Sequence, residues 1–126
     1  APEEWGGAPT QQGHTVRDRL ADPSLSSVAL FNYVDARDAG RFVLAWLEKA
    51  DDIPNGSVFF VGAADSMVRT AVGPALAAAY PAAAGLTGAL PATAPVFSSE
   101  LARTLLGWEP IHTWRTELGE PTEQGA

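Results

Sequence analysis

The chain has 126 residues, 46% of them hydrophobic, and it carries a formal net charge of −7 with no cysteine. This length is typical of one domain, so we expect a single core. The acidic charge, without clustered Lys and Arg, argues against nucleic acid as a partner and disfavours an anionic membrane surface. Without cysteine the chain can form no disulfide, thiolate nucleophile or zinc–cysteine site.

The hydropathy pattern contains no membrane signal. No apolar run approaches the ~20 residues that a membrane-spanning helix needs. The first residues lack the basic and apolar regions of a signal peptide. Together with the absence of cysteine, this pattern predicts a cytoplasmic protein without a membrane partner.

Residues 1–27 are rich in Pro, Gly, Gln, Ser and Asp and show no periodicity. They predict an irregular loop, with at most a short helical turn over Thr15–Leu20. A structureless stretch of this length is uncommon inside a compact domain and is usually functional or supported by another part of the protein.

The next stretch predicts a strand that leads directly into a helix. Leu30–Val34 is aromatic and β-branched, a composition typical of strands. Asp35 then suits an N-cap that accepts from the backbone N–H of Asp38, and Lys49 suits the opposite end of the helix. The apolar face of this helix is formed at helical spacing by Ala39, Phe42, Val43, Trp46 and Leu47.

A second strand is predicted after the Asn-Gly turn at 55–56. Ser57–Val61 is apolar without alternation, which is typical of a strand buried on both faces of a parallel sheet. Two strands alone are marginally stable. The sequence therefore predicts part of an α/β sheet whose other strands come from a longer chain or from another copy.

The C-terminal half predicts further helices separated by irregular backbone. In order, these are a helix over 74–80, an irregular connection over 82–95, a helix ending at 106 with Gly107 after it, a final turn over 113–118 and a flexible tail over 119–126.

Common catalytic and metal-binding patterns are missing. The sequence contains neither GxGxxG nor GxxxxGK[ST], and His14 and His112 have no partner at metal-ligand spacing. Ser98 or Ser99 could be combined with His112 and Asp65 into a triad, but no GxSxG elbow supports it, and the serines suit helix caps better.

The predicted strand–helix junction is the main candidate site. Asp35, Arg37 and Asp38 have a structural interpretation as a cap with a local ion pair. They also have a functional one, because ligands bind at the carboxyl ends of strands in open α/β sheets. In that case Arg37 would face an anionic or hydroxylated ligand, with Tyr33 beside it.

Three segments in the same order resemble one enzyme family. Tyr33–Ala39 resembles a YVDxRDxA segment, Ser57–Gly62 resembles a late sheet strand, and Phe97–Pro110 resembles an F-x-x-x-x-A-x-x-x-LGW-x-P signature. These are features of the extended short-chain dehydrogenases/reductases, the NAD-dependent epimerase/dehydratase family. The resemblance extends over about 28–118.

The resemblance implies an α/β fold, or α+β as an isolated fragment, with two main strands and three or four helices. The chain would be the C-terminal substrate-binding part of an extended Rossmann-type enzyme, with 1–27 as a substrate-side loop and 28–118 as the domain. The family's glycine-rich motif and Tyr-x-x-x-Lys lie upstream of the region matched. Here Tyr33 is followed at that spacing by Arg37, and Tyr80 by Ala84.

We therefore expect no catalytic, cofactor-binding or metal-binding residue in this chain. NAD or NADP would be bound by an N-terminal dinucleotide-binding domain that the chain lacks. The family's diphosphate-binding arginines are replaced here by Leu30–Asn32 and Leu90–Thr93, so the resemblance implies a small hydroxyl or carbonyl substrate. Its contacts would be residues 1–13, Tyr33 and Arg37.

A second interpretation is a free-standing, non-catalytic domain. It would bind a small molecule, or form a homodimer through exposed sheet edges.

Overall fold

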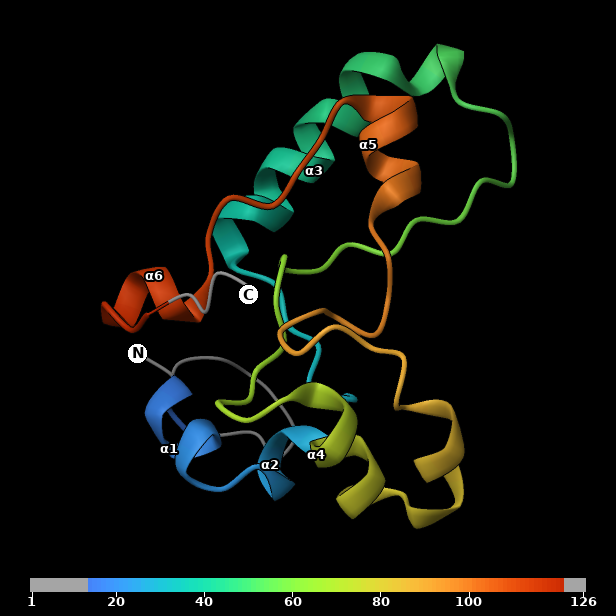
Figure 1. The fold of residues 1–126 in the computed structure, drawn as a ribbon. Helices are drawn as coiled ribbons and strands as arrows, with labels where there is room; N and C mark the ends of the chain where they lie inside the picture. The colour runs from blue at the N-terminus through green and yellow to red at the C-terminus, as the bar shows by residue number, and fades with distance from the viewer. Residues whose placement is uncertain (1–13, 122–126) are drawn as a thin grey trace.

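The computed structural model describes residues 14–121 of the chain, and in this range it is helical without a β-strand. The elements are α1 (Val16–Ala21), α2 (Ser24–Ser27), α3 (Ala36–Lys49), the 3₁₀ helix η2 (Ala50–Asp52), α4 (Val72–Ala79), the 3₁₀ helix η3 (Pro81–Leu86), α5 (Glu100–Leu106) and α6 (Trp114–Leu118). At one end of the molecule α3 packs against α5, and at the other end α4 packs against α2 and η3 (Figure 1). Extended segments connect the two ends.

The predicted α/β fold with two main strands is therefore wrong for the described residues, and α+β is equally wrong. Leu30–Val34 forms a turn followed by irregular backbone. Phe31 donates its backbone N–H to the carbonyl of Ser26 at 3.0 Å, and Leu30 and Phe31 have φ angles of 53° and 61°. This left-handed pair reverses the chain after α2. The local turn and the burial of Phe31 thus override the β propensity of the segment.

The second predicted strand, Ser57–Val61, is extended but unpaired (Figure 1). A strand needs backbone hydrogen bonds to a neighbouring strand, and no residue within 14–121 supplies them. Val58 and Phe60 are 73% and 51% exposed, while Phe59 and Val61 pack against a core cluster. The expectation that this segment is buried on both faces is wrong, because only alternate side chains are covered.

The helix after the first predicted strand is confirmed. It begins after Asp35 and ends at Lys49, as the capping pattern predicts. The side chain of Asp35 accepts a hydrogen bond from the backbone N–H of Arg37 at 2.8 Å, however, and not from that of Asp38. The helix therefore has the predicted bounds with a different capping bond.

Local signals also predict several shorter elements correctly. Thr15 forms a capping box with Asp18 at the start of α1, and Gly107 ends α5 with a φ of 64°. The final turn is α6. In contrast, α4 begins at Val72, before the predicted start at Pro74, because proline is tolerated in the first helical turn.

The structure describes only part of the segments predicted at the two ends of the chain. The predicted loop 1–27 contains α1 and α2 where the structure describes it, and its residues 1–13 lie outside the described residues. The same is true of 122–126 in the predicted tail. The stretch 82–95, predicted as irregular, begins within η3.

The buried apolar side chains form three small clusters. The buried members of the first, between α4 and the turn after α2, are Phe31, Val68, Val72 and Leu76. Those of the second are Leu20, Met67 and Trp114. Those of the third, between α3 and α5, are Ala102, Leu106 and Trp108. Core formation is thus divided among three sites, and many large apolar side chains remain exposed.

No helix within residues 14–121 combines the length and the apolar character required to cross a membrane.

Candidate functional site

The predicted contact residue Tyr33 lies beside α6, in contact with a buried ion pair. Its hydroxyl donates a hydrogen bond to Asp65 and accepts one from the backbone N–H of Trp114 at 2.8 Å. Burial and the hydrogen bond to Asp65 raise the pKa of the Tyr33 phenol, so the phenol remains protonated at neutral pH. The only hydroxyl hydrogen is thus used within the chain, while the role of Tyr33 as a ligand contact stays a prediction.

Arg37, the second predicted contact, lies on the surface at the start of α3. Its guanidinium pairs with Asp35 and with Glu117, each at 2.8 Å, and 54% of its side chain is exposed. The hydrogen bonds to these two carboxylates raise the pKa of Arg37. The arginine links α3 to α6, and its exposed part faces solvent.

Asp38 is fully buried and connects α3 to the segment after α5. Its carboxylate accepts from the backbone N–H groups of Ile111 and His112 at 3.0 and 2.9 Å, and from Arg41 at 2.7 Å. Burial raises the pKa of Asp38, but the hydrogen bonds from His112, Ile111 and Arg41 outweigh this effect and hold the pKa below its usual value. This pattern explains Asp38 without a ligand.

The buried ion pair of Asp65 and Arg115 was not predicted. Arg115 also donates to the carbonyl of Val68 at 2.9 Å, and its guanidinium lies 4.3 Å from the ring centroid of Trp114. A buried charge needs such partners. The sequence signal was weak, because a lone Asp in a loop and an Arg near the C-terminus have no fixed spacing.

The structure does not assemble the Ser–His–Asp grouping considered from sequence. The Ser98 hydroxyl accepts from the backbone N–H of Glu100 at 3.1 Å. His112 contacts Asp38, and Asp65 pairs with Arg115. Each of these side chains has a separate local role.

Within residues 14–121, no three His, Cys, Asp or Glu residues are grouped as metal ligands. His112 is held at 3.0 Å from a carboxylate oxygen of Asp38. Both histidines thus lie apart from any cluster of ligands in the described part of the chain.

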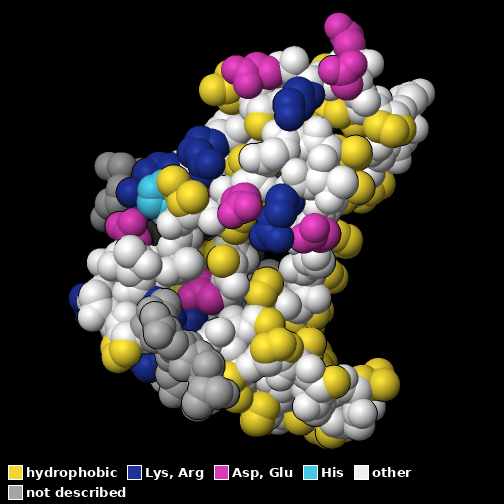
Figure 2. All heavy atoms as spheres, turned by 45° about the horizontal axis from the view of Figure 1, so that its top comes forward, with side chains coloured by type: hydrophobic (Ala, Val, Ile, Leu, Met, Phe, Trp, Pro, Cys, Tyr) yellow, Lys and Arg dark blue, Asp and Glu magenta, His cyan; other side chains and the backbone are white. Residues whose placement is uncertain are grey.

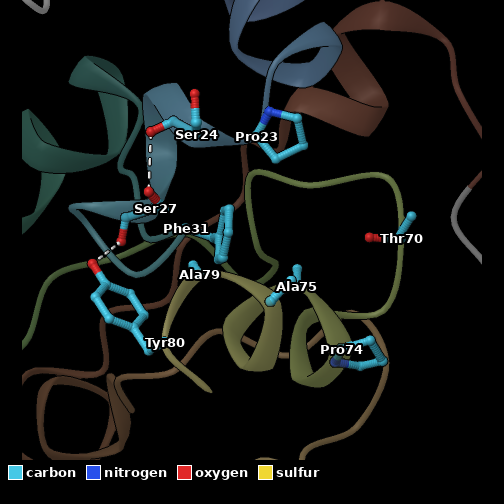
Figure 3. Close-up of a pocket in the computed structure, with 10 residues that line it drawn as sticks. Pro23, Ser24, Ser27, Phe31, Thr70, Pro74, Ala75, Ala79 and Tyr80 are labelled. Atoms are coloured by element: carbon cyan, nitrogen blue, oxygen red, sulfur yellow. Dashed lines mark hydrogen bonds between the residues drawn. The ribbon is translucent and has the colours of Figure 1, made fainter. Parts of the chain in front are cut away.

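An open cleft of ≈ 680 Å³ lies between α2 and α4. Figure 3 shows Phe31 at its centre, with side chains of α2 on one side and those of α4 on the other. The cleft is lined by Pro23, Ser24, Ser27, Phe31, Thr70, Pro74, Ala75, Ala78, Ala79 and Tyr80. None of these residues is charged. Sequence reasoning did not predict this cleft, because it depends on how two helices pack.

A second surface feature is a group of exposed apolar side chains on α3 and the extended segments, here called the apolar face. We define it by Val43, Trp46, Val58, Phe60 and Phe97, which are 40–73% exposed. The rings of Phe60 and Phe97 stack with centroids 4.6 Å apart. A groove of ≈ 260 Å³ lined by Phe42, Val43, Trp46 and Phe59 joins α3 to the extended segment.

Figure 2 shows hydrophobic side chains gathered along one edge of the molecule, on the side where Figure 1 draws the segment after η2. Monomeric soluble proteins rarely expose large contiguous apolar patches, and those that do commonly use them for binding. The apolar face therefore has the character of an interaction surface.

The three segments that carry the family resemblance contact one another. The backbone N–H of Gly62 donates to the hydroxyl of Ser99 at 3.3 Å. The indole N–H of Trp108 donates to the carbonyl of Asp38 at 3.1 Å. Residues from distant parts of the sequence thus form one connected unit around α3.

Comparison of the chain with protein-family models, with curated protein sequences and with solved structures finds no match. The resemblance therefore rests on the motifs of the sequence alone, and the function of the chain is a proposal.

Proposed function

We propose that this chain is the C-terminal substrate-binding part of a larger cytoplasmic NAD(P)-dependent epimerase, dehydratase or reductase. Its substrate is a small hydroxyl or carbonyl compound, and the chain is not catalytic alone. In the complete enzyme, an N-terminal domain supplies the dinucleotide site and the Tyr-x-x-x-Lys pair. Tyr33 and Arg37 are the proposed substrate contacts in this part.

The apolar face is the observation that carries the proposal. Val58 and Phe60 expose 73% and 51% of their surfaces. Within the described residues, no backbone hydrogen bond involves the N–H or C=O groups of 58–61. Burying one such side chain contributes about 1.5–3 kcal/mol. A neighbouring domain that covers this face would gain this energy.

The contacts among the three motif segments add support. Motifs that are far apart in sequence but connected in space are expected when they serve one domain. The cysteine-free composition supports action in the reducing cytoplasm.

Nucleotide binding by the complete reading frame tests the proposal. We expect quenching or enhancement of NADH or NADPH fluorescence on binding to the complete protein, and none with this chain alone. Turnover of NAD(P)H by this chain alone would contradict the proposal.

A matched pair of variants tests the docking role of the apolar face in the complete protein. Val58→Lys should weaken the association between the two parts, whereas Val28→Lys should not. Val28 is 75% exposed in the turn after α2, so it matches Val58 in type and exposure. Equal effects of the two substitutions on thermal unfolding and nucleotide binding would contradict a specific docking face.

The same face also supports a second candidate function, the self-association of a free-standing, non-catalytic domain. In that case light scattering of this chain gives a dimer with twice the mass of 13.2 kDa, and Val58→Lys reduces the dimer fraction. A monomer at all concentrations would exclude this alternative.

A further inference from the structure

The cleft between α2 and α4 has the size and chemistry of a small-molecule site. Its volume of ≈ 680 Å³ lies within the ~300–1,000 Å³ typical of ligand pockets. Four side chains of α4, including Pro74 and Ala75, give it an apolar surface, and the buried Phe31 lies beneath them. Because no lining residue is charged, an ionic ligand would lose its hydration without a compensating ion pair.

The backbone at the centre of this cleft is unusual. Leu30 and Phe31 both have positive φ angles, a conformation that non-glycine residues rarely adopt and that clusters at ligand sites. Backbone bonds hold the turn, since Phe31 donates to Ser26 and accepts from Met67, at 3.0 and 2.8 Å. The turn places Phe31, 1% exposed, between the two helices.

Hydroxyl oxygens provide the polar part of the cleft. Tyr80 donates its hydroxyl hydrogen to the carbonyl of Ser27 at 2.9 Å, and Ser27 donates its own to the carbonyl of Ser24 at 3.0 Å (Figure 3). Both oxygens keep lone pairs that can accept a hydrogen bond. The hydrogens of Tyr80 and Ser27 are already used, so at these two oxygens a ligand must donate the hydrogen bond.

We propose that this cleft binds an uncharged small molecule that combines an apolar, aromatic or aliphatic body with a hydroxyl group. The body lies against Pro74 and the alanines of α4, above the buried Phe31, and the hydroxyl donates to the oxygen of Tyr80. The site is formed by residues of this chain alone, so the inference does not depend on the proposed enzyme function.

A nuclear magnetic resonance titration of this chain tests the site with defined probes. The probe 2-naphthol has a hydroxyl, 2-methoxynaphthalene has the same rings without a donor, and 2-naphthoate is charged. We expect 2-naphthol to shift the amide signals of Phe31, Ala75 and Tyr80, with weaker binding of the methoxy compound. Absence of these shifts, or equal binding of 2-naphthoate, would overturn the proposal.

Filling the cleft gives a structural test. Ala78 lines the cleft and is exposed, so Ala78→Trp should fit on α4 and reduce 2-naphthol affinity at least about tenfold, or 1.4 kcal/mol. Ala82→Trp is the control, because Ala82 is exposed in η3 and does not line the cleft. An unchanged affinity of the Ala78→Trp variant for 2-naphthol would overturn the assignment of the binding site to this cleft.

Tyr80→Phe tests the polar contact separately. It removes one hydroxyl from an exposed position, so we expect a folded protein whose affinity for 2-naphthol falls about three- to tenfold, the effect of one hydrogen bond. Binding of 2-methoxynaphthalene should not change. An equal loss for both probes would assign Tyr80 a structural role and overturn the proposed hydroxyl contact.

Discussion

The buried carboxylate of Asp38 binds both the backbone N–H and the imidazole ring of His112, a residue 74 positions further along the chain. The two contacts measure 2.9 and 3.0 Å. They fasten the first turn of α3 to the segment that follows α5. The indole N–H of Trp108 donates to the carbonyl of Asp38 as well. This aspartate is therefore a main connection between the motif segments Tyr33–Ala39 and Phe97–Pro110.

Replacing Asp38 should therefore destabilise the fold strongly. Asp38→Ala leaves the N–H groups of Ile111 and His112 without their acceptor and Arg41 without its carboxylate partner. Removing one member of such a buried group typically costs about 3–5 kcal/mol. Urea unfolding followed by tryptophan fluorescence measures this loss. Asp51→Ala is the control, and its exposed position in η2 predicts a change of less than about 0.5 kcal/mol.

The two aspartates at the start of α3 also predict that the stability of the fold is sensitive to acid. The hydrogen bond from Arg37 lowers the pKa of Asp35 to about 2, and that of Asp38 is lowered too. Unfolded aspartate has a pKa of about 3.9, so these carboxylates bind fewer protons in the folded state. Their contribution is fully present above about pH 4 and is lost as the pH falls toward about 2.

Urea midpoints at a series of acidic pH values measure this effect. Asp35→Asn keeps a capping side chain and removes the titrating group, so its stability should depend less steeply on pH than that of the unaltered protein. If the urea midpoints of the two proteins depend on pH in the same way, the carboxylate of Asp35 does not contribute to the acid sensitivity.

Tyr33→Phe is expected to cost about 1–3 kcal/mol, because it leaves the N–H of Trp114 and an oxygen of Asp65 without a partner. Tyr80→Phe provides the matched control, since its hydroxyl bonds only the exposed carbonyl of Ser27. Thermal unfolding of the two variants gives the comparison. Similar stability losses would show that the hydroxyl of Tyr33 has no special structural role.

Exposure of the apolar face predicts dye binding by this chain in isolation. Anilinonaphthalene sulfonate should bind with enhanced fluorescence, and the Val58→Lys, Phe60→Lys double variant should remove most of that signal. Val28→Lys should retain it, because Val28 is exposed in the turn after α2 and does not belong to this face. Equal signals from all three proteins would contradict a localised face.

The sequence was sufficient for elements whose signals are local. The capping residue Asp35 predicts the start of α3, and Gly107 predicts the end of α5. These signals act within one helical turn, so they do not depend on the remaining fold.

The strand predictions failed because a strand depends on a partner. Ser57–Val61 has strand composition and an extended backbone, but the described part of the chain offers no neighbouring strand. Leu30–Val34 has similar composition, yet the turn after α2 and the burial of Phe31 determine its conformation. Composition cannot weigh these long-range contacts.

Candidate sites were predictable to a similar extent. The sequence brought attention to Tyr33, Arg37 and Asp38, and the structure shows which partners each has. No pattern in the sequence indicated the pair formed by Asp65 and Arg115, or the cleft, since both require segments that meet only after folding.

The intact mass of the native protein tests the central proposal most directly. If this chain is the substrate-binding part of a larger enzyme, the protein isolated from its source has a mass well above 13.2 kDa, with additional sequence before Ala1 that contains the dinucleotide-binding glycines. A native mass of 13.2 kDa would contradict the proposal and favour the free-standing domain.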